Sequence, residues 1–119
     1  MSRFVRLSLV TLVLSAASIA PASAGNAWYW GQITQVITSE PDGSFIVYID
    51  NADLLSTCAY DRVNFLVLDM GPERTKAALS MALMAFAAGK EYGVVVNLPP
   101  AGNECFASRT ATQGAGVRG

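Results

Sequence analysis

Apolar and polar residues alternate along the chain in a way that predicts several short strands around one helix. Residues 28–38 are rich in aromatic and β-branched side chains, and residues 44–51 form a second such run. The turn residues Pro41, Asp42 and Gly43 separate the two runs, so we expect a hairpin. Further strands are expected over residues 61–69, 91–98 and 104–112.

The helix is expected between the third and fourth strands, where Pro72 stands near its first position and Gly89 follows it as a C-cap. At 100° per residue its apolar side chains form two stripes. The first stripe comprises Leu79, Ala82, Leu83 and Phe86. The opposite stripe comprises Ala77, Met81, Met84 and Ala88. The predicted order is β-β-β-α-β-β.

Both stripes of this helix need a covering surface, because no charged residue lies between Ala77 and Gly89. The sheet can cover the first stripe. We expect the second stripe, with Met81 and Met84 at its centre, to contact another subunit. Two alternatives stay open: a mildly exposed face made of good helix formers, or a helix lying on a membrane surface.

The first 24 residues have the three parts of a secretory signal peptide. Arg3 and Arg6 are the basic residues, residues 7–20 form the apolar run, and Ala22 to Ala24 form a small-residue cleavage site. This run is shorter than the roughly 20 residues that span a bilayer, so no membrane span is expected after processing. We expect a periplasmic or secreted bacterial protein, with a domain over residues 25–112 and a flexible tail over 113–119.

The composition of the chain disfavours several further classes of function. The chain has 119 residues, eight basic and nine acidic side chains, and no histidine. The signal peptide holds two of the arginines, so the processed chain has six basic against nine acidic residues, a net charge of −3. This charge disfavours nucleic acid as a partner. The lack of histidine removes the commonest catalytic base and metal ligand, and we predict neither catalytic residues, metal nor cofactor.

Cys58 and Cys105 are the only cysteines, and both follow the signal peptide. In an oxidising compartment one pair allows one connectivity, so we predict a Cys58–Cys105 disulfide. A redox or metal site fits less well, because the chain has no C-x-x-C motif and no third thiolate.

Trp28, Tyr29 and Trp30 form the candidate ligand-binding segment, because flat aromatic rings stack on sugars. Neighbouring residues of a strand point to opposite faces, so Tyr29 is expected to part from the two tryptophans. The alternative is that the rings are divided between the core and a subunit contact. Asp50, Asp53 and Asp61 lack the spacing of a calcium loop, and we interpret them as solvated acids.

Five strands with a helix after the third are the layout of an OB-fold barrel. More specific elements are the Gly31 to Val36 run, a cysteine before the third strand, and a helix that ends at residues 85–90 as AFAAGK. The valine strand over residues 94–96 and Cys105 then follow. Over about residues 31–106 the chain resembles the small exported OB-fold family typified by the B subunit of subtilase cytotoxin.

The resemblance implies a five-stranded OB-fold barrel that assembles as a homopentamer, as in one-A-five-B bacterial toxins. It also implies sialylated host glycans as ligands and an A-type subunit as a possible partner. The serine and tyrosine that contact glycans in that family have no clear match in this chain. We expect a non-catalytic, homo-oligomeric subunit that binds a glycan or a surface receptor. The alternative is a periplasmic structural or interaction module without a sugar ligand, and a small hydrolase is a third.

Overall fold

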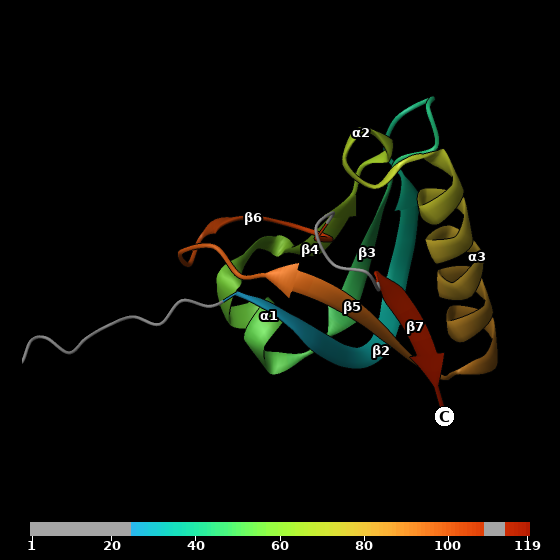
Figure 1. Cartoon of the computed structure of the whole chain (residues 1–119). Helices are drawn as coiled ribbons and strands as arrows, with labels where there is room; N and C mark the ends of the chain where they lie inside the picture. Colours follow the sequence, from blue (N-terminus) through green and yellow to red (C-terminus); the bar gives the residue numbers. More distant parts are fainter. Residues whose placement is uncertain (1–24, 109–113) are drawn as a thin grey trace, which may run out of the picture.

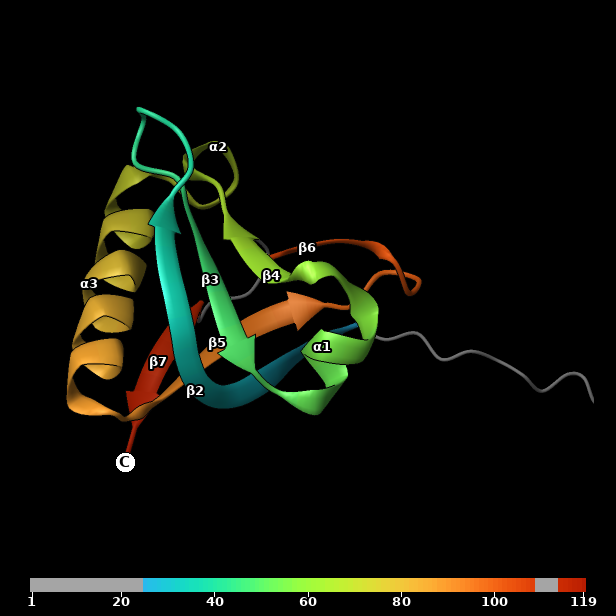
Figure 2. The same ribbon diagram turned by 180° about the vertical axis from the view of Figure 1, so that it is seen from behind.

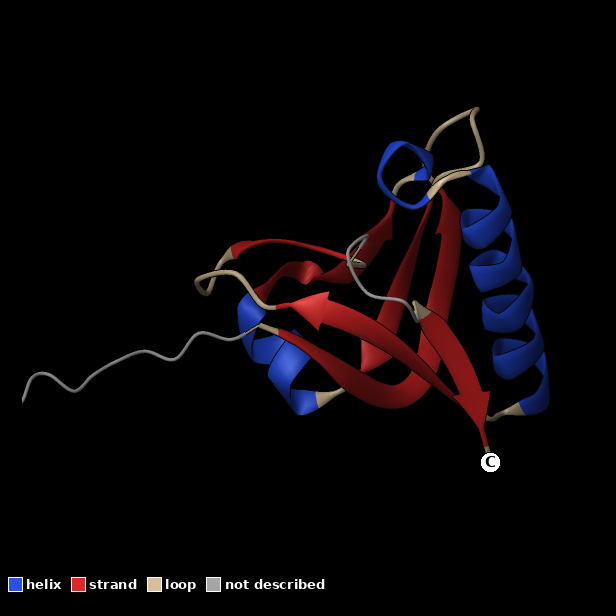
Figure 3. Cartoon of the chain, viewed as in Figure 1, coloured by secondary structure: helices blue, strands red, loops and turns tan. Residues whose placement is uncertain are grey.

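The computed structural model describes residues 25–108 and 114–119. Within these residues the chain forms one six-stranded sheet and three helices (Figure 1; Figure 3). The mostly β architecture predicted from the sequence is therefore confirmed. The predicted signal peptide and the last part of the expected fifth strand, residues 109–112, lie outside the described residues.

The longest strand, β2 (Asn26–Thr38), lies at the centre of the sheet and has a different partner along each half. Its first half pairs with β5 (Glu91–Asn97), and its second half pairs with β3 (Phe45–Asp50), both antiparallel. A register irregularity between Ile33 and Gln35 follows the changeover. Figures 1 and 2 show that β2 curves strongly from the end near α1 towards the end beside α3.

The complete strand order is β6-β4-β3-β2-β5-β7. Strand β4 (Cys58–Phe65) pairs antiparallel with β3, and β6 (Asn103–Phe106) runs parallel to β4. Strand β7 (Ala115–Arg118) is antiparallel to β5. Beyond β6, one isolated bridge joins Val96 to Ala107.

The expected closed, five-stranded barrel is wrong, because the described sheet has six strands and stays open. Closure would require β6 to pair along β5. Instead, β7 occupies the edge of β5 from residue 91 to 94, and the next residues of β5 bond to Ala107, Ser108 and Gly114. Residues 115–118 therefore form a strand where the sequence predicted a flexible tail.

The expectation of one helix is also wrong, because two short helices flank β4. Helix α1 (Ala52–Thr57) occupies a segment expected to be a loop. Its N-cap is Asn51, whose side-chain oxygen accepts hydrogen bonds from the backbone N–H groups of Asp53 and Leu54. Helix α2 (Val67–Met70) replaces the end of the strand expected over residues 61–69.

The long helix α3 (Pro72–Ala88) has the predicted limits, with Pro72 in its first turn and Gly89 as a left-handed C-cap at φ 68°. It lies along one side of the sheet (Figure 2). The residues that it buries form one row of small side chains: Thr75, Ala78, Ala82 and Ala85. Small side chains let the helix axis come close to the strands, where the Tyr92 hydroxyl donates a 2.8 Å hydrogen bond to the Ala78 carbonyl.

The predicted Cys58–Cys105 disulfide is confirmed, with 5.3 Å between the two Cα atoms. Both cysteines are buried, and the bond joins the start of β4 to β6. The adjacent core contains the stacked rings of Phe45 and Phe65, whose centroids are 4.4 Å apart. The disulfide therefore attaches the short edge strand β6 to the buried core.

Candidate functional site

The candidate segment Trp28–Tyr29–Trp30 is divided between two faces of β2, as strand alternation predicts. The indoles of Trp28 and Trp30 stack with their centroids 5.2 Å apart. Tyr29 packs instead against the core, where burial and then the charge of Asp53 raise the pKa of its hydroxyl. The structure therefore brings together the two tryptophans and separates Tyr29 from them.

The two indoles are already packed against their own sheet. A Cβ atom on Gly93 would lie 2.5 Å from the ring of Trp30, so this glycine provides the surface on which the indole rests. The guanidinium carbon of Arg118 lies 4.3 Å from the centroid of the Trp30 ring, and Arg118 also pairs with Glu91 at 2.7 Å. Both indoles are half-buried as a result. This packing favours a structural role for Trp30.

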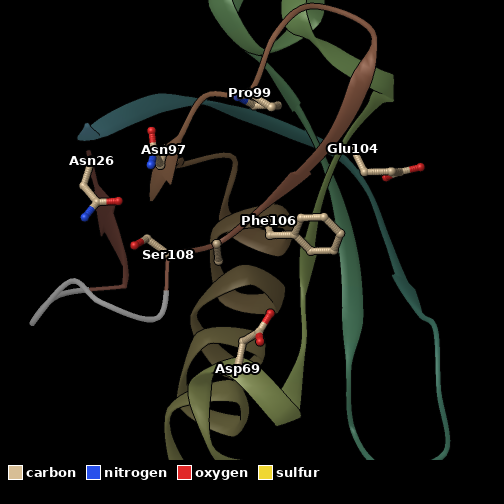
Figure 4. Close-up of a pocket in the computed structure, with 8 residues that line it drawn as sticks. Asn26, Asp69, Asn97, Pro99, Glu104, Phe106 and Ser108 are labelled. Carbon is tan, nitrogen blue, oxygen red and sulfur yellow. The ribbon is translucent and has the colours of Figure 1, made fainter. Parts of the chain in front are cut away.

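A pocket of about 430 Å³ lies at a different place, where β6 passes the ends of β2 and β5 (Figure 4). Its wall combines amide, hydroxyl, carboxylate and aromatic side chains. The lining residues are Asn26, Asp69, Asn97, Pro99, Glu104, Phe106, Ala107 and Ser108. None of the three candidate aromatic residues lines it. Sequence reasoning missed this pocket because its residues come from four separate segments, which only the fold brings together.

Hydrogen-bonding groups gather on one side of the pocket. Asn26 and Asn97 are direct partners in the β2–β5 register, and Ser108 lies beside them (Figure 4). Phe106 is 43% exposed and separates this group from Glu104. Amides and a hydroxyl next to an accessible ring are the groups that bind the hydroxyls and the apolar face of a sugar.

Glu104 is held in place by two neighbours on β4. Its carboxylate accepts hydrogen bonds from Arg62 at 2.9 and 3.3 Å and from the Asn64 amide at 2.7 Å. Arg62 first, and Asn64 to a lesser degree, lower the pKa of this carboxyl group. Glu104 is therefore an ionised acceptor with a fixed orientation on the pocket wall.

Two of the three aspartates noted in the sequence come together. Asp50 and Asp61 line a second cleft of about 220 Å³, together with Thr34, Tyr48, Ile49 and Leu55. Asp53 lies in the first turn of α1 instead. Among the described residues, no three acidic or cysteine side chains are grouped closely enough to hold a metal ion.

The two stripes of α3 are placed differently from the expectation. Of the first stripe, Ala82 is buried and Leu79 is half-buried, whereas Leu83 and Phe86 are 50% and 51% exposed. Of the candidate interface residues, Ala77, Met84 and Ala88 are exposed, and Met81 packs partly against the core. The surface of α3 thus carries apolar side chains on both flanks of its buried row.

No helix within residues 25–108 and 114–119 is long and apolar enough to cross a membrane. Comparison of the chain with family models, with curated proteins and with solved structures finds no match.

Proposed function

We propose that this protein is an exported, non-catalytic glycan-binding subunit that assembles with copies of itself. The observation that carries the proposal is the pocket of Figure 4, where Asn26, Asn97 and Ser108 lie beside the exposed ring of Phe106. Sugars offer both hydroxyl groups and an apolar C–H face, and this pocket has a partner for each.

The strand connections support an open relative of the OB-fold. Strands β2, β3 and β4 form an antiparallel meander, α3 connects β4 to β5, and β6 returns parallel to β4. This is the order that OB-folds use, without full closure. It agrees with the resemblance to the subtilase cytotoxin B family, from which we propose a ring of five subunits.

The exposed apolar side chains of α3 support self-association. Met84 is 55% exposed, and Leu83, Phe86, Ala87 and Ala88 are exposed around it. A helix that is apolar on several sides is normally covered by another layer. We propose that neighbouring subunits provide that layer, through Ala77, Met81, Met84 and Ala88.

Export is proposed from the first 24 residues together with the buried disulfide, which forms and persists in oxidising compartments. Expression of the full chain in a bacterium, followed by mass spectrometry of the periplasmic fraction, should give a protein that begins at Gly25. A protein that keeps residues 1–24 would contradict this part of the proposal.

The glycan proposal is tested by screening the oxidised, processed protein against immobilised glycans. Asn97→Ala and Phe106→Ala should each lose most of the retained signal, because they remove a hydrogen-bonding group and the stacking surface. Gln35→Ala, at an exposed position of β2, is the matched control and should bind like the wild type. Trp30→Ala tests whether the glycan binds at the stacked pair Trp28 and Trp30 instead of at the pocket. A thermal melt shows whether this variant has folded.

Each result of the screen has a definite meaning. Loss of binding only in Trp30→Ala would show that the glycan binds at Trp28 and Trp30 and not in the pocket. If no glycan is retained, the glycan proposal is overturned. That result would favour a structural or interaction module, an alternative with which the exposed apolar side chains of α3 also agree.

A further inference from the structure

The second cleft also has the chemistry of a sugar site. Tyr48 and Asp50 come from β3, Asp61 from β4, Thr34 from β2 and Leu55 from α1. Asp50 and Asp61 are exposed carboxylates that can accept hydrogen bonds from ligand hydroxyls. Leu55, 42% exposed, adds an apolar surface.

An exposed aromatic residue, Tyr60, directly precedes Asp61 of this cleft in the chain. Tyr60 is 73% exposed, and the backbone holds it and Asp61 at φ 58° and 57°, a left-handed conformation that is uncommon outside glycine. The pairing of β4 with β6 is irregular over the same stretch, between Cys58 and Val63. The guanidinium of Arg62 lies 4.8 Å from the Tyr60 ring centroid and orients it.

Arg62 also connects the cleft to the pocket of Figure 4. Its guanidinium makes a bidentate contact with Glu104, which lines that pocket. The hydrogen bonds to Glu104 are the first cause of the raised pKa of Arg62. Arg62 therefore contacts Glu104 of the pocket and Tyr60, the residue before Asp61 of the cleft.

We infer that the pocket of Figure 4 and the cleft beside Tyr48 are two subsites of one surface, which binds a neutral oligosaccharide across the Tyr60–Arg62 ridge. The inference rests on the proposed glycan function and deepens it. The volumes of about 430 and 220 Å³ suit a larger and a smaller part of one chain of sugar rings.

The charge of the cleft argues against an anionic ligand. The charged side chains that line it are Asp50 and Asp61, and the neighbouring Arg62 is already paired with Glu104. An anionic sugar in this cleft would meet two carboxylates without a cation to balance it, and like charges repel. This differs from the sialylated glycans that the family resemblance implies.

The test compares ligands of different length and charge by calorimetry and by amide chemical shifts. The probes are lactose, neutral lacto-N-neotetraose, its α2,3-sialylated form, maltose and maltotetraose. In either the lactose or the maltose series, the neutral tetrasaccharide should bind at least about tenfold more tightly than the disaccharide. Once one end of the tetrasaccharide is bound, its contact with the second subsite is intramolecular. The tetrasaccharide should shift amides at both the Figure 4 pocket and the cleft.

Two variants separate the subsites. Asp50→Asn and Tyr60→Ala should weaken the tetrasaccharide more than the disaccharide, so that the gain from chain length is lost. Asn97→Ala should weaken both ligands, and Asp53→Asn, an acid outside the cleft, should weaken neither. Thermal melts of each variant show whether it has remained folded.

Four results would overturn the inference. Equal affinity for both chain lengths, or full tetrasaccharide affinity in Asp50→Asn and Tyr60→Ala, would show that the protein has a single subsite. The proposed glycan-binding function would still stand in that case. Tighter binding of the sialylated probe would refute a neutral ligand. If no saccharide binds to the wild type, the inference and the proposed function fail together.

Discussion

Tyr92 has its phenol ring fully buried beneath α3, with the hydroxyl bonded to the Ala78 carbonyl. Burial raises the pKa of this hydroxyl far above its ordinary value of 10.0, since the phenolate has no solvation there. The folded state therefore retains this proton at a pH where the unfolded chain releases it.

The pH dependence of stability follows from this difference. Below pH 10 both states are protonated and the contribution of Tyr92 is fully present. Above pH 10 the unfolded state binds fewer protons, so the free energy of unfolding should fall with pH by up to about 1.4 kcal/mol per unit. Denaturant titrations from pH 8 to 11 should show a shallower fall in Tyr92→Phe than in the wild type.

Gly31 is required by a close approach of two backbones. A Cβ atom there would lie 2.3 Å from the carbonyl oxygen of Asp50, and a backbone oxygen in a paired strand cannot move aside. Gly31→Ala should lower the free energy of unfolding by about 3 kcal/mol, as overpacking does. Gly116→Ala is the matched control, because its nearest new contact is 3.4 Å from Trp30. Similar melting temperatures for the two variants would contradict the argument.

Among the elements, the short strand β6 depends most on a covalent bond. The disulfide closes a loop of 47 residues, and loop entropy assigns about 4 kcal/mol to such a closure. Unfolding in denaturant with and without a reductant should therefore show a large loss of stability on reduction. The double variant Cys58→Ser/Cys105→Ser should behave like the reduced protein, and unchanged midpoints would show that β6 is held by pairing alone.

Strands and helices with a strong local pattern were predictable from the sequence. Helix α3 has Pro72 and Gly89 at its ends, so its limits were correct, and β5 has a run of valines followed by prolines, so its predicted end was one residue too late. Strand β7 has two small residues and no alternating pattern, and it exists because β5 offers it an edge. The αL residues Tyr60 and Asp61 likewise leave no local signal in the sequence.

The candidate site was less predictable than the fold. The aromatic segment was the most visible feature of the sequence, yet Trp30 lies against Gly93 and beneath Arg118. These partners are more than 60 residues away in the chain, so only the register of β2, β5 and β7 brings them together. The same holds for Asn26 and Asn97, which become neighbours through that register.

At the scale of the whole molecule, the exposed face of α3 predicts the assembly state. Met84→Glu should dissociate the oligomer, because a buried charge without a partner is costly at an interface. Light scattering of the oxidised protein should show subunit-sized particles for this variant and larger ones for the wild type. Leu68→Glu, an equally drastic change at the exposed tip of α2, is the control. A wild-type monomer would remove the role assigned to Met84.

One edge of β5 pairs with two segments that come later in the chain, and this affects the order in which the protein folds. Ser108 bonds to Val95, and β7 pairs with residues 91–94, so both partners of this edge follow β5 in the chain. Cys105, which completes the disulfide, also follows it. A chain that is still emerging, from a ribosome or from a translocation channel, therefore carries a valine-rich strand with an unpaired edge, a state that favours association with other chains. Native pairing on this side therefore depends on segments that follow β5 in the chain, and we expect this edge to be completed late in folding.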